Sequence, residues 1–161
     1  MAIDYRQART TDLHQLLPLV EAYALDQQAQ MPINSLTERF MEYARAGMAQ
    51  AVEHPAGCVM VAEETTDGAP RIVGYAVGMA QEPPAIFEPE IYTFITDLYV
   101  VPDYRRQGIG TGLVERVRGW GWVKGINRLS VVLPEGNAGR GLLAKLGFRP
   151  VQTMFYSGER D

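Results

Sequence analysis

Three glycines and two arginines lie within eight residues of this chain, in the segment RRQGIGTG at residues 105–112. A strand pattern precedes the segment and a helix pattern follows it, so that Gly108 and Gly110 open the helix. Amide groups in the first turn of a helix have no partner within the helix and lie at the positive end of its dipole. Together with the charges of Arg105 and Arg106, these amides predict a site for an anion such as phosphate.

Three interpretations of this loop compete at the level of the residues. A P-loop requires a lysine beside serine or threonine, and Gly110-Thr111-Gly112 has no such lysine. A dinucleotide-binding loop requires a third glycine, where Leu113 stands, and an acid at the end of the next strand, where Leu133 stands. The third interpretation is a glycine-rich helix start that only packs closely against a strand. The glycines alone do not separate an anion site from close packing.

The rest of the chain alternates between strand and helix patterns. Alternating or β-branched runs predict strands at residues 3–9, 57–64, 71–81, 91–101, 128–133 and 148–156. Apolar residues at helical spacing predict helices that begin after Thr10 and Thr11, at Ser35 with a capping box to Glu38, at Gly108, and at 137. The segment 27–34 is expected to break the first helix, and Gly147 to cap the last. This order predicts an α/β fold with a central mixed β-sheet and helices on both faces.

Composition narrows the class of protein. The 161 residues suit one domain over 1–161, and a net charge of −4 argues weakly against a nucleic-acid partner. The first ten residues lack a signal-peptide core and no apolar run is long enough for a membrane span, so the expected location is the cytoplasm. Cys58 is expected to be buried in a strand, and His14 and His54 have no partners at metal-binding spacing. No metal site is therefore predicted.

The residues on both sides of the loop resemble the GNAT N-acetyltransferase superfamily. The pattern Arg105-x-x-Gly108-x-Gly110, after the strand and loop LYVVPDY at residues 98–104, is similar to the cofactor-binding motif of that family. The run LLAKLGF at residues 142–148 is similar to the family's other characteristic motif, which is a helix that ends in the pattern K-x-G-F. The resemblance is strong over residues 91–148 and weaker before them. It implies a GNAT-like acyl-CoA N-acyltransferase fold.

The resemblance implies acetyl-CoA as the donor. In that family the loop donates amides to the CoA pyrophosphate, while the preceding strand carries a bulge and splays from the next strand, leaving a gap for the pantetheine arm. The implied cofactor-binding residues are Leu98, Tyr99, Val100, Arg105, Arg106, Gln107, Gly108, Ile109, Gly110, Thr111, Gly112 and Asn137. Asn137 lies one residue later than the asparagine of the family, and capping of the helix is the alternative role for it.

The resemblance also implies direct attack of a primary amine on the acetyl carbonyl. The amine must first lose a proton, and Asp97 is the candidate base, with a structural role at the bulge as an equal alternative. The amide of Leu98 is implied to stabilise the oxyanion. Leu143 stands where many members carry the tyrosine that protonates the leaving thiolate. Tyr156 is the candidate acid in its place, and unassisted departure of the thiolate is the alternative.

The acceptor has no recognisable signature in the sequence. The loop 82–90 and the first two helices are expected to line its pocket, and the further candidate acids are Glu82, Glu88, Glu90 and Glu135. A small-molecule amine is favoured over a protein, and a homodimer is possible, both as family-level expectations. Two other functions remain open at this point: a non-catalytic module that binds acetyl-CoA, and a nucleotide-binding protein that uses the glycine loop.

Overall fold

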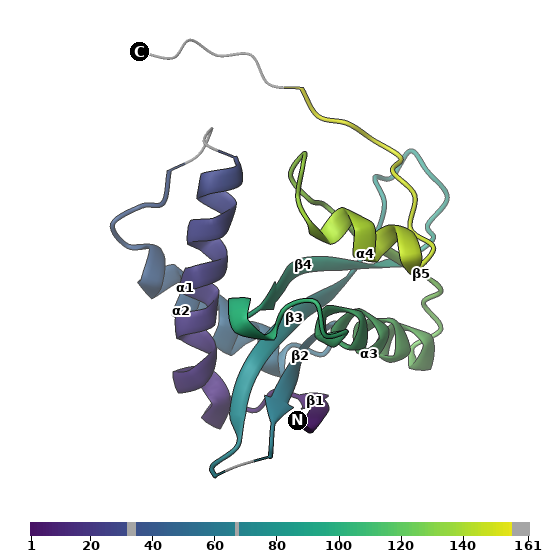
Figure 1. The fold of residues 1–161 in the computed structure, drawn as a ribbon. Coiled ribbons are helices and arrows are strands. Elements are labelled where there is room, and N and C mark those ends of the chain that lie inside the picture. Colours follow the sequence, from purple (N-terminus) through teal and green to yellow (C-terminus); the bar gives the residue numbers. More distant parts are fainter. Residues whose placement is uncertain (32–34, 67, 156–161) are drawn as a thin grey trace.

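The computed structural model describes residues 1–31, 35–66 and 68–155. The strands form a sheet across the middle of the molecule, with helices on both of its sides (Figure 1). In chain order the elements are β1 (Ile3–Gln7), η1 (Thr10–Asp12), α1 (Leu13–Gln30), α2 (Phe40–Glu53), β2 (Gly57–Glu64), β3 (Arg71–Gln81), β4 (Tyr92–Val100), η2 (Pro102–Tyr104), α3 (Ile109–Val123), β5 (Arg128–Val131) and α4 (Gly139–Lys145).

The sheet is mixed, as the sequence predicts. Its five strands lie in the order β1-β2-β3-β4-β5, and the first three pairings are antiparallel. The pairing of β4 with β5 is parallel, because α3 carries the chain back along the sheet between them. The predicted α/β class with helices on both faces is confirmed.

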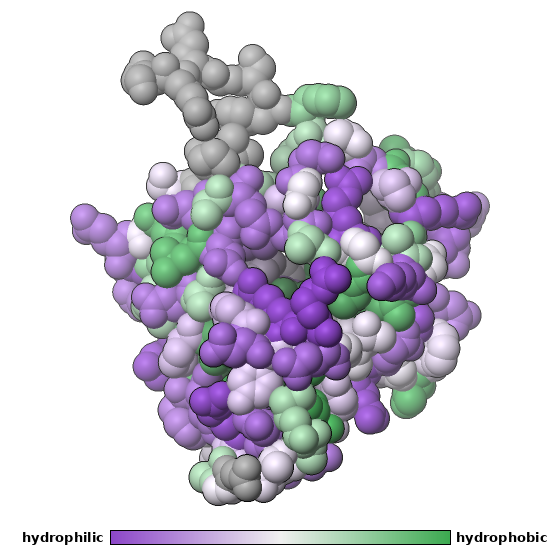
Figure 2. Space-filling model, viewed as in Figure 1, coloured by the Kyte–Doolittle hydropathy of each residue, from purple (hydrophilic) through white to green (hydrophobic). Residues whose placement is uncertain are grey.

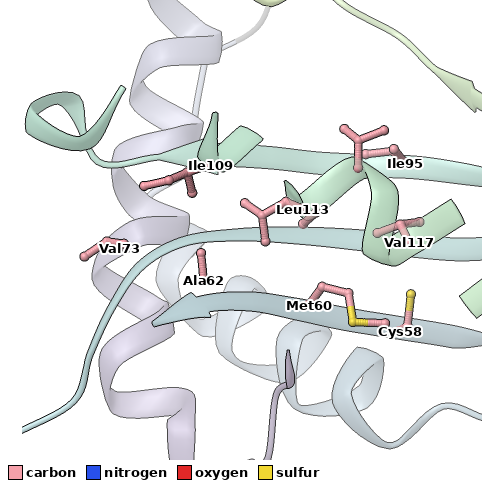
Figure 3. Close-up of a cluster of buried hydrophobic side chains, with 10 residues drawn as sticks. Cys58, Met60, Ala62, Val73, Ile95, Ile109, Leu113 and Val117 are labelled. Atoms are coloured by element: carbon pink, nitrogen blue, oxygen red, sulfur yellow. The ribbon is translucent and has the colours of Figure 1, made fainter. Parts of the chain in front are cut away.

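Each face of the sheet has its own apolar core. On one face, Leu113 and Val117 of α3 pack with Ile95 and with alternate residues of β2, as Figure 3 shows. On the other face, α1 and α2 cover a second cluster that contains Tyr75 and Tyr99. The face seen in Figure 2 is mostly hydrophilic, with its hydrophobic residues in small separate groups. The two cores hold the sheet rigid on both sides of β4.

Strand β4 contains a bulge and then separates from β5. Val77 pairs with Asp97 and Gly78 pairs with Ile95, so Thr96 is an extra residue on β4. The parallel pairing with β5 extends only from Tyr92 to Ile95. After the bulge, β4 therefore has a sheet partner on one side only, which opens a split between β4 and β5.

The helix boundaries differ from the predictions at two places. The second helix begins at Phe40 rather than Ser35, and Leu36, which lies between these two residues, is exposed. The predicted capping box at Ser35 is wrong, because residues 35–37 lie outside the helix. The first helix continues to Gln30, through the first part of the predicted break at 27–34, whose residues 32–34 lie outside the described structure. The polar residues at 27–30 suggest the end of the helix, but polar residues on an exposed face are compatible with a helix. None of them is a glycine or proline that would end α1 before Met31.

The cap of the first helix also differs. The prediction places Thr10 and Thr11 before the helix as caps, but both lie inside η1. Asp12 directly precedes α1 but makes no side-chain cap bond to it; its carboxylate instead accepts a hydrogen bond from the amide of Arg9, at the start of η1, at 2.7 Å. The guanidinium of Arg6 pairs with the same carboxylate at 2.8 Å and lowers the pKa of Asp12.

Of the two predictions for the last part of the chain, the helix end at Gly147 is correct and the strand at 148–156 is wrong over its described residues. Gly147 ends α4 in the left-handed conformation (φ 84°), and the amides of Gly147 and Phe148 donate to the carbonyls of Ala144 and Leu143. This is a Schellman cap, and it confirms the predicted helix end. The strand predicted at 148–156 is wrong over residues 148–155, which form no strand and leave the sheet (Figure 1). Pro150 lacks an amide donor in the middle of that segment.

Candidate active site

The loop between β4 and α3 presents a row of free amides. Two of its residues have left-handed backbone, Arg106 (φ 65°) and Gly108 (φ 82°), and Gly108 directly precedes α3. Within the described residues, none of the amides from Arg106 to Thr111 donates a hydrogen bond to the protein, whereas Gly112 donates to the carbonyl of Gly108 at 3.0 Å. Because these amides also lie at the start of a 15-residue helix, they form a cradle suited to an anion.

The three glycines of the loop serve different purposes. Gly108 supplies the left-handed turn, and a Cβ there would meet no atom within 4 Å. At Gly112 an added Cβ would come within 2.3 Å of the ring of Tyr5, and at Gly110 within 2.9 Å of Leu142. The interpretation as close packing therefore holds for Gly110 and Gly112. The free amides add an anion site that close packing does not explain.

The two arginines of the loop are placed differently. The Nε of Arg105 donates to the carbonyl of Val100 at 2.8 Å, and its guanidinium pairs with Asp26 at 3.2 Å. The same guanidinium lies over the ring of Tyr99, 5.4 Å from its centre. Arg105 thus fastens the loop to β4 and to α1, while the side chain of Arg106 is exposed beside the free amides.

The split between β4 and β5 leaves backbone groups of β4 without a sheet partner. Val101 donates its amide to the carbonyl of Val73 in β3, at 2.9 Å. Since successive residues of a strand turn their backbone groups to opposite edges, Leu98 and Val100 turn theirs away from β3, toward the split. The contact from Arg105 to the carbonyl of Val100 lies on this side. The side chain of Leu98 packs on the α3 core, while Tyr99 lies among the aromatic rings of the opposite face.

Asp97 lies just after the bulge, in contact with a buried tyrosine. The hydroxyl of Tyr75 donates to the Asp97 carboxylate at 3.0 Å, and the Tyr75 side chain has no exposed surface. Burial raises the pKa of Asp97, although hydrogen bonds from Tyr75 and Thr96 offset part of the rise. Burial and the neighbouring Asp97 charge also raise the pKa of Tyr75. A carboxylate with a raised pKa is a stronger base than an ordinary aspartate, which suits proton abstraction.

A cavity of about 400 Å³ begins at Asp97 and extends under α2. Its strand wall consists of Val77, Met79, Thr96 and Asp97. Its helix wall comes mainly from α2, with Phe40, Ala44, Gly47, Met48, Gln50 and Ala51, and is completed by Val20 and His54. The first two helices therefore line this pocket, as expected, whereas none of the residues 82–90 does.

The alternative acids of the sequence lie elsewhere. Glu90 pairs with Arg128 at 2.8 Å and Glu135 pairs with Arg140 at 2.7 Å. Glu82 and Glu88 are exposed and, like the other two, do not line the cavity. Asp97 is the only carboxylate among the lining residues.

Sequence reasoning missed two features of this pocket. Tyr75 pairs with an aspartate 22 residues later in the chain. The sequence feature that could have identified Tyr75 is that it carries the one aromatic hydroxyl in RIVGYAVGMA, a strand otherwise made mainly of small and aliphatic residues. His54 follows α2, and its Nδ1 accepts the amide hydrogen of Ala56 at 3.0 Å. Nothing in the local pattern separated it from a surface histidine.

The remaining candidates are placed as follows. The side chain of Asn137 accepts the amide hydrogen of Gly139 at 2.7 Å and also contacts Gln30, so it stabilises the first turn of α4. Leu143 is buried under α4. Tyr156, the candidate acid, lies outside the described residues. Cys58 is buried in β2 as predicted, and burial raises the pKa of its thiol to about 11.

Two further features are absent from the described residues. Among residues 1–31, 35–66 and 68–155, no group of three or more His, Cys, Asp or Glu side chains is arranged to hold a metal ion. None of the described helices combines the length and apolar character that a membrane-spanning helix needs.

Comparison with known proteins places this geometry in a family. No curated protein sequence matches the chain. Among solved structures, a predicted acetyltransferase from Clostridium acetobutylicum with acetyl-CoA has a TM-score of 0.76 at 19% identity, covering 98% of this chain and 96% of its own. The aminoglycoside antibiotic 6'-N-acetyltransferase AAC(6')-Ih from Acinetobacter baumannii has a TM-score of 0.72 at 17% identity, covering 99% of both chains. At these identities the two structures show a shared fold.

One further solved structure is informative because of what it contains. AAC(6')-Iy, in complex with the bisubstrate analogue CoA-S-monomethyl-acetylneamine, has a TM-score of 0.71 at 18% identity over the whole of both chains. The profile of the acetyltransferase (GNAT) family matches residues 19–148, which include the bulge, the loop of free amides and α4. The chain is therefore an acetyltransferase and belongs to the GNAT family.

Proposed function

We propose that this protein, as a single domain over residues 1–161, transfers the acetyl group of acetyl-CoA to the nitrogen of a primary amine. The observation that carries the proposal is the bulge of β4, which has a split lined by free backbone groups on one side and the Asp97 cavity on the other. A donor in the split and an acceptor in the cavity would meet at the bulge. Holding two reactants together in this way is itself a large contribution to catalysis.

The donor is proposed to bind along β4 and the start of α3. The free amides of Arg106, Gln107, Gly108, Ile109, Gly110 and Thr111 suit the pyrophosphate of CoA, and the backbone of Leu98 and Val100 suits its amide-bearing arm. Gly112 lets α3 lie close to β1. Arg105 and Tyr99 are proposed to support the loop, and Asn137 the start of α4, rather than to contact the phosphates directly.

Two groups at the bulge are proposed to act in the reaction. Asp97 accepts a proton from the ammonium group of the acceptor, which frees the nitrogen to attack the acetyl carbonyl. The amide of Leu98 donates a hydrogen bond to the oxygen of that carbonyl as negative charge develops. The carbon–sulfur bond then breaks, the CoA sulfur leaves with the electron pair as the thiolate, and the nitrogen gives up its second excess proton to that thiolate or to water. A thiol with a pKa near 8.5 can leave as the thiolate, so the proposed reaction does not require Tyr156.

Binding and turnover test the proposal separately. Acetyl-CoA is expected to raise the melting temperature of the protein, with no comparable effect from ATP or NAD, because a ligand of the native state stabilises it by mass action. Free CoA should then appear when a panel of primary amines is added, measured with a thiol reagent. Stabilisation by acetyl-CoA without CoA release from any amine would favour a non-catalytic binding module. A larger shift with ATP or NAD would favour a nucleotide-binding protein.

We also propose that the protein forms a homodimer through the β5 end of the sheet. Strand β5 is an edge strand, and exposed apolar residues lie beside it or in the segment that follows α4: Val132, Val151, Met154 and Phe155. Exposed edges and apolar patches of this kind commonly pair with another chain.

Light scattering after size exclusion checks the dimer. The expected mass is twice the 17.9 kDa of the chain. Val132→Lys should shift the mass toward the monomer, whereas Val123→Lys, at an even more exposed position at the end of α3, should not. A wild-type mass of one chain at micromolar concentration would contradict the proposed dimer.

A further inference from the structure

The wall of the Asp97 cavity is mostly apolar. Besides Asp97, the polar residues of the lining are Gln50, His54 and Thr96, and the rest is formed by glycine and by aliphatic, aromatic and sulfur-containing side chains, among them Phe40, Met48 and Met79. Aromatic rings and polarisable thioethers favour flat or extended hydrocarbon groups in contact with them. The volume of about 400 Å³ is in the lower part of the range for small-molecule sites, so it fits a compact ligand.

The charges in the cavity allow for one ammonium group only. Asp97 is the one carboxylate in the lining. His54 accepts a hydrogen bond at Nδ1, so its other ring nitrogen carries the hydrogen and can only donate, which does not favour a cation. A second ammonium group on the acceptor would enter a mostly apolar space, where the other polar residues Gln50 and Thr96 carry no charge to neutralise it, and burial of an unpaired charge is strongly unfavourable.

Gly47 shows that part of this space is kept open at a cost to the helix. It lies within α2 and lines the cavity, yet a Cβ at this position would meet no atom within 4 Å. Glycine is the least favourable non-proline residue in a helix interior. Neither a close contact nor a left-handed backbone requires glycine here. The space in front of it is therefore available to a ligand.

We infer that the acceptor is a primary monoamine with an apolar body, alkyl or aryl, rather than a polycationic amine. The inference rests on the proposed function. The apolar body occupies the space between α2 and the strands β3 and β4, and the single amino group lies at Asp97. This differs from the neamine portion of the analogue bound to AAC(6')-Iy, which carries several amino groups.

The first arm of the test is an amine series with the wild-type protein. Initial rates of CoA release are measured for ethylamine, butylamine, hexylamine and 2-phenylethylamine, and for the polycations spermidine and neamine. The value of kcat/KM should rise by about fourfold per methylene along the alkyl series until the cavity is full, as expected for burial of apolar surface. It should be at least about a hundredfold higher for hexylamine than for neamine, as expected when a second charge has no partner.

The second arm fills the cavity at Gly47. Gly47→Leu should lower kcat/KM for hexylamine and 2-phenylethylamine about tenfold or more, leave that for ethylamine nearly unchanged, and keep or raise the melting temperature. The matched control is Gly119→Leu in α3, where an added Cβ also meets no atom within 4 Å but which does not line the Asp97 cavity. This control should leave the whole amine profile unchanged.

The outcomes separate this inference from the proposed function. Preference for spermidine or neamine, a flat alkyl series, or an unchanged profile in Gly47→Leu would overturn the apolar-monoamine acceptor and leave acetyl transfer intact. Binding of acetyl-CoA without transfer to any of the six amines would overturn both.

Discussion

Asp97→Asn is expected to lower kcat/KM by about 10²–10⁴-fold, the usual contribution of a general base. Asparagine has the shape of aspartate but cannot take a proton from the acceptor. Its side-chain oxygen can still accept the hydrogen bond from Tyr75, so the local geometry at the bulge is preserved. In the wild-type protein kcat/KM should rise with pH through the raised pKa of Asp97, and the variant should lose this limb of the profile.

The same substitution is expected to stabilise the protein at neutral pH. Burial raises the pKa of Asp97 in the folded state above the value of about 3.9 in an unfolded chain. The unfolded state therefore loses its proton first as the pH rises, and stability falls between the unfolded and the folded pKa. Asparagine does not titrate, so the variant does not lose stability in this way. The melting temperature of Asp97→Asn should match that of the wild type near pH 4 and exceed it near pH 8.

The combination of activity and stability decides the role of Asp97. If the carboxylate only supports the bulge, Asp97→Asn should lower the melting temperature and leave most of the activity. Asp4→Asn, an exposed aspartate in β1, is the control for the loss of one negative charge and should change neither quantity appreciably. Tyr75→Phe keeps the base but removes its hydrogen-bond donor, and should move the pH profile rather than abolish the reaction.

Gly112→Ala should destabilise the protein by about 1–3 kcal/mol, the usual cost of overpacking a filled site. The added methyl group would lie 2.3 Å from the ring of Tyr5, which is held between α3 and the sheet. Either the ring moves or α3 shifts at its first turn, where the free amides of the loop are fixed. Thermal denaturation measures the first effect, and the affinity for acetyl-CoA measures the second, which should weaken.

A second substitution tests whether Tyr5 is the cause. In a Tyr5→Leu background the end of the ring is gone, so Gly112→Ala should cost clearly less than it does in the wild type, a coupling typical of residues in contact. Gly119→Ala, in the same helix with no atom within 4 Å of the added Cβ, should be neutral or stabilising. Equal melting temperatures for Gly112→Ala and Gly119→Ala would rule out the steric limit at Tyr5.

Local patterns predicted most of the fold because the signals were local. Strands β2 and β3 follow from apolar runs around a turn, and α3 from the period of Leu113, Val114 and Val117. The end of α4 follows from Gly147, since its cap involves only neighbouring residues. The predicted start of α2 was wrong because Ser35 and Glu38 have the spacing of a capping box whether or not the chain is helical at these residues.

The parts that could not be predicted depend on residues far apart in the chain. Asp97 was a candidate base by resemblance, but its raised pKa comes from burial in the folded protein, and the hydrogen bond from Tyr75, 22 residues away, offsets part of that rise. For Gly112 the sequence left an anion site and close packing both open, and only the position of Tyr5, over a hundred residues earlier, shows that packing requires glycine there. The segment after Phe148 has apolar residues at strand-like spacing, but a strand needs a neighbour to pair with.

The extra residue in β4 also determines which side of the sheet each later residue faces. Before Thr96, Ile95 belongs to the core under α3, and after it Tyr99 belongs to the core under α1 and α2, although both positions are odd in number. If Thr96 were paired as a regular strand residue instead of forming the bulge, alternation would direct Asp97 into the apolar core under α3. Substitutions at position 96 can preserve the bulge, whereas a deletion there would remove the bulge and leave Asp97, Leu98 and Tyr99 on the faces that they occupy now. The site therefore depends on the bulge at position 96 more than on the side chain there.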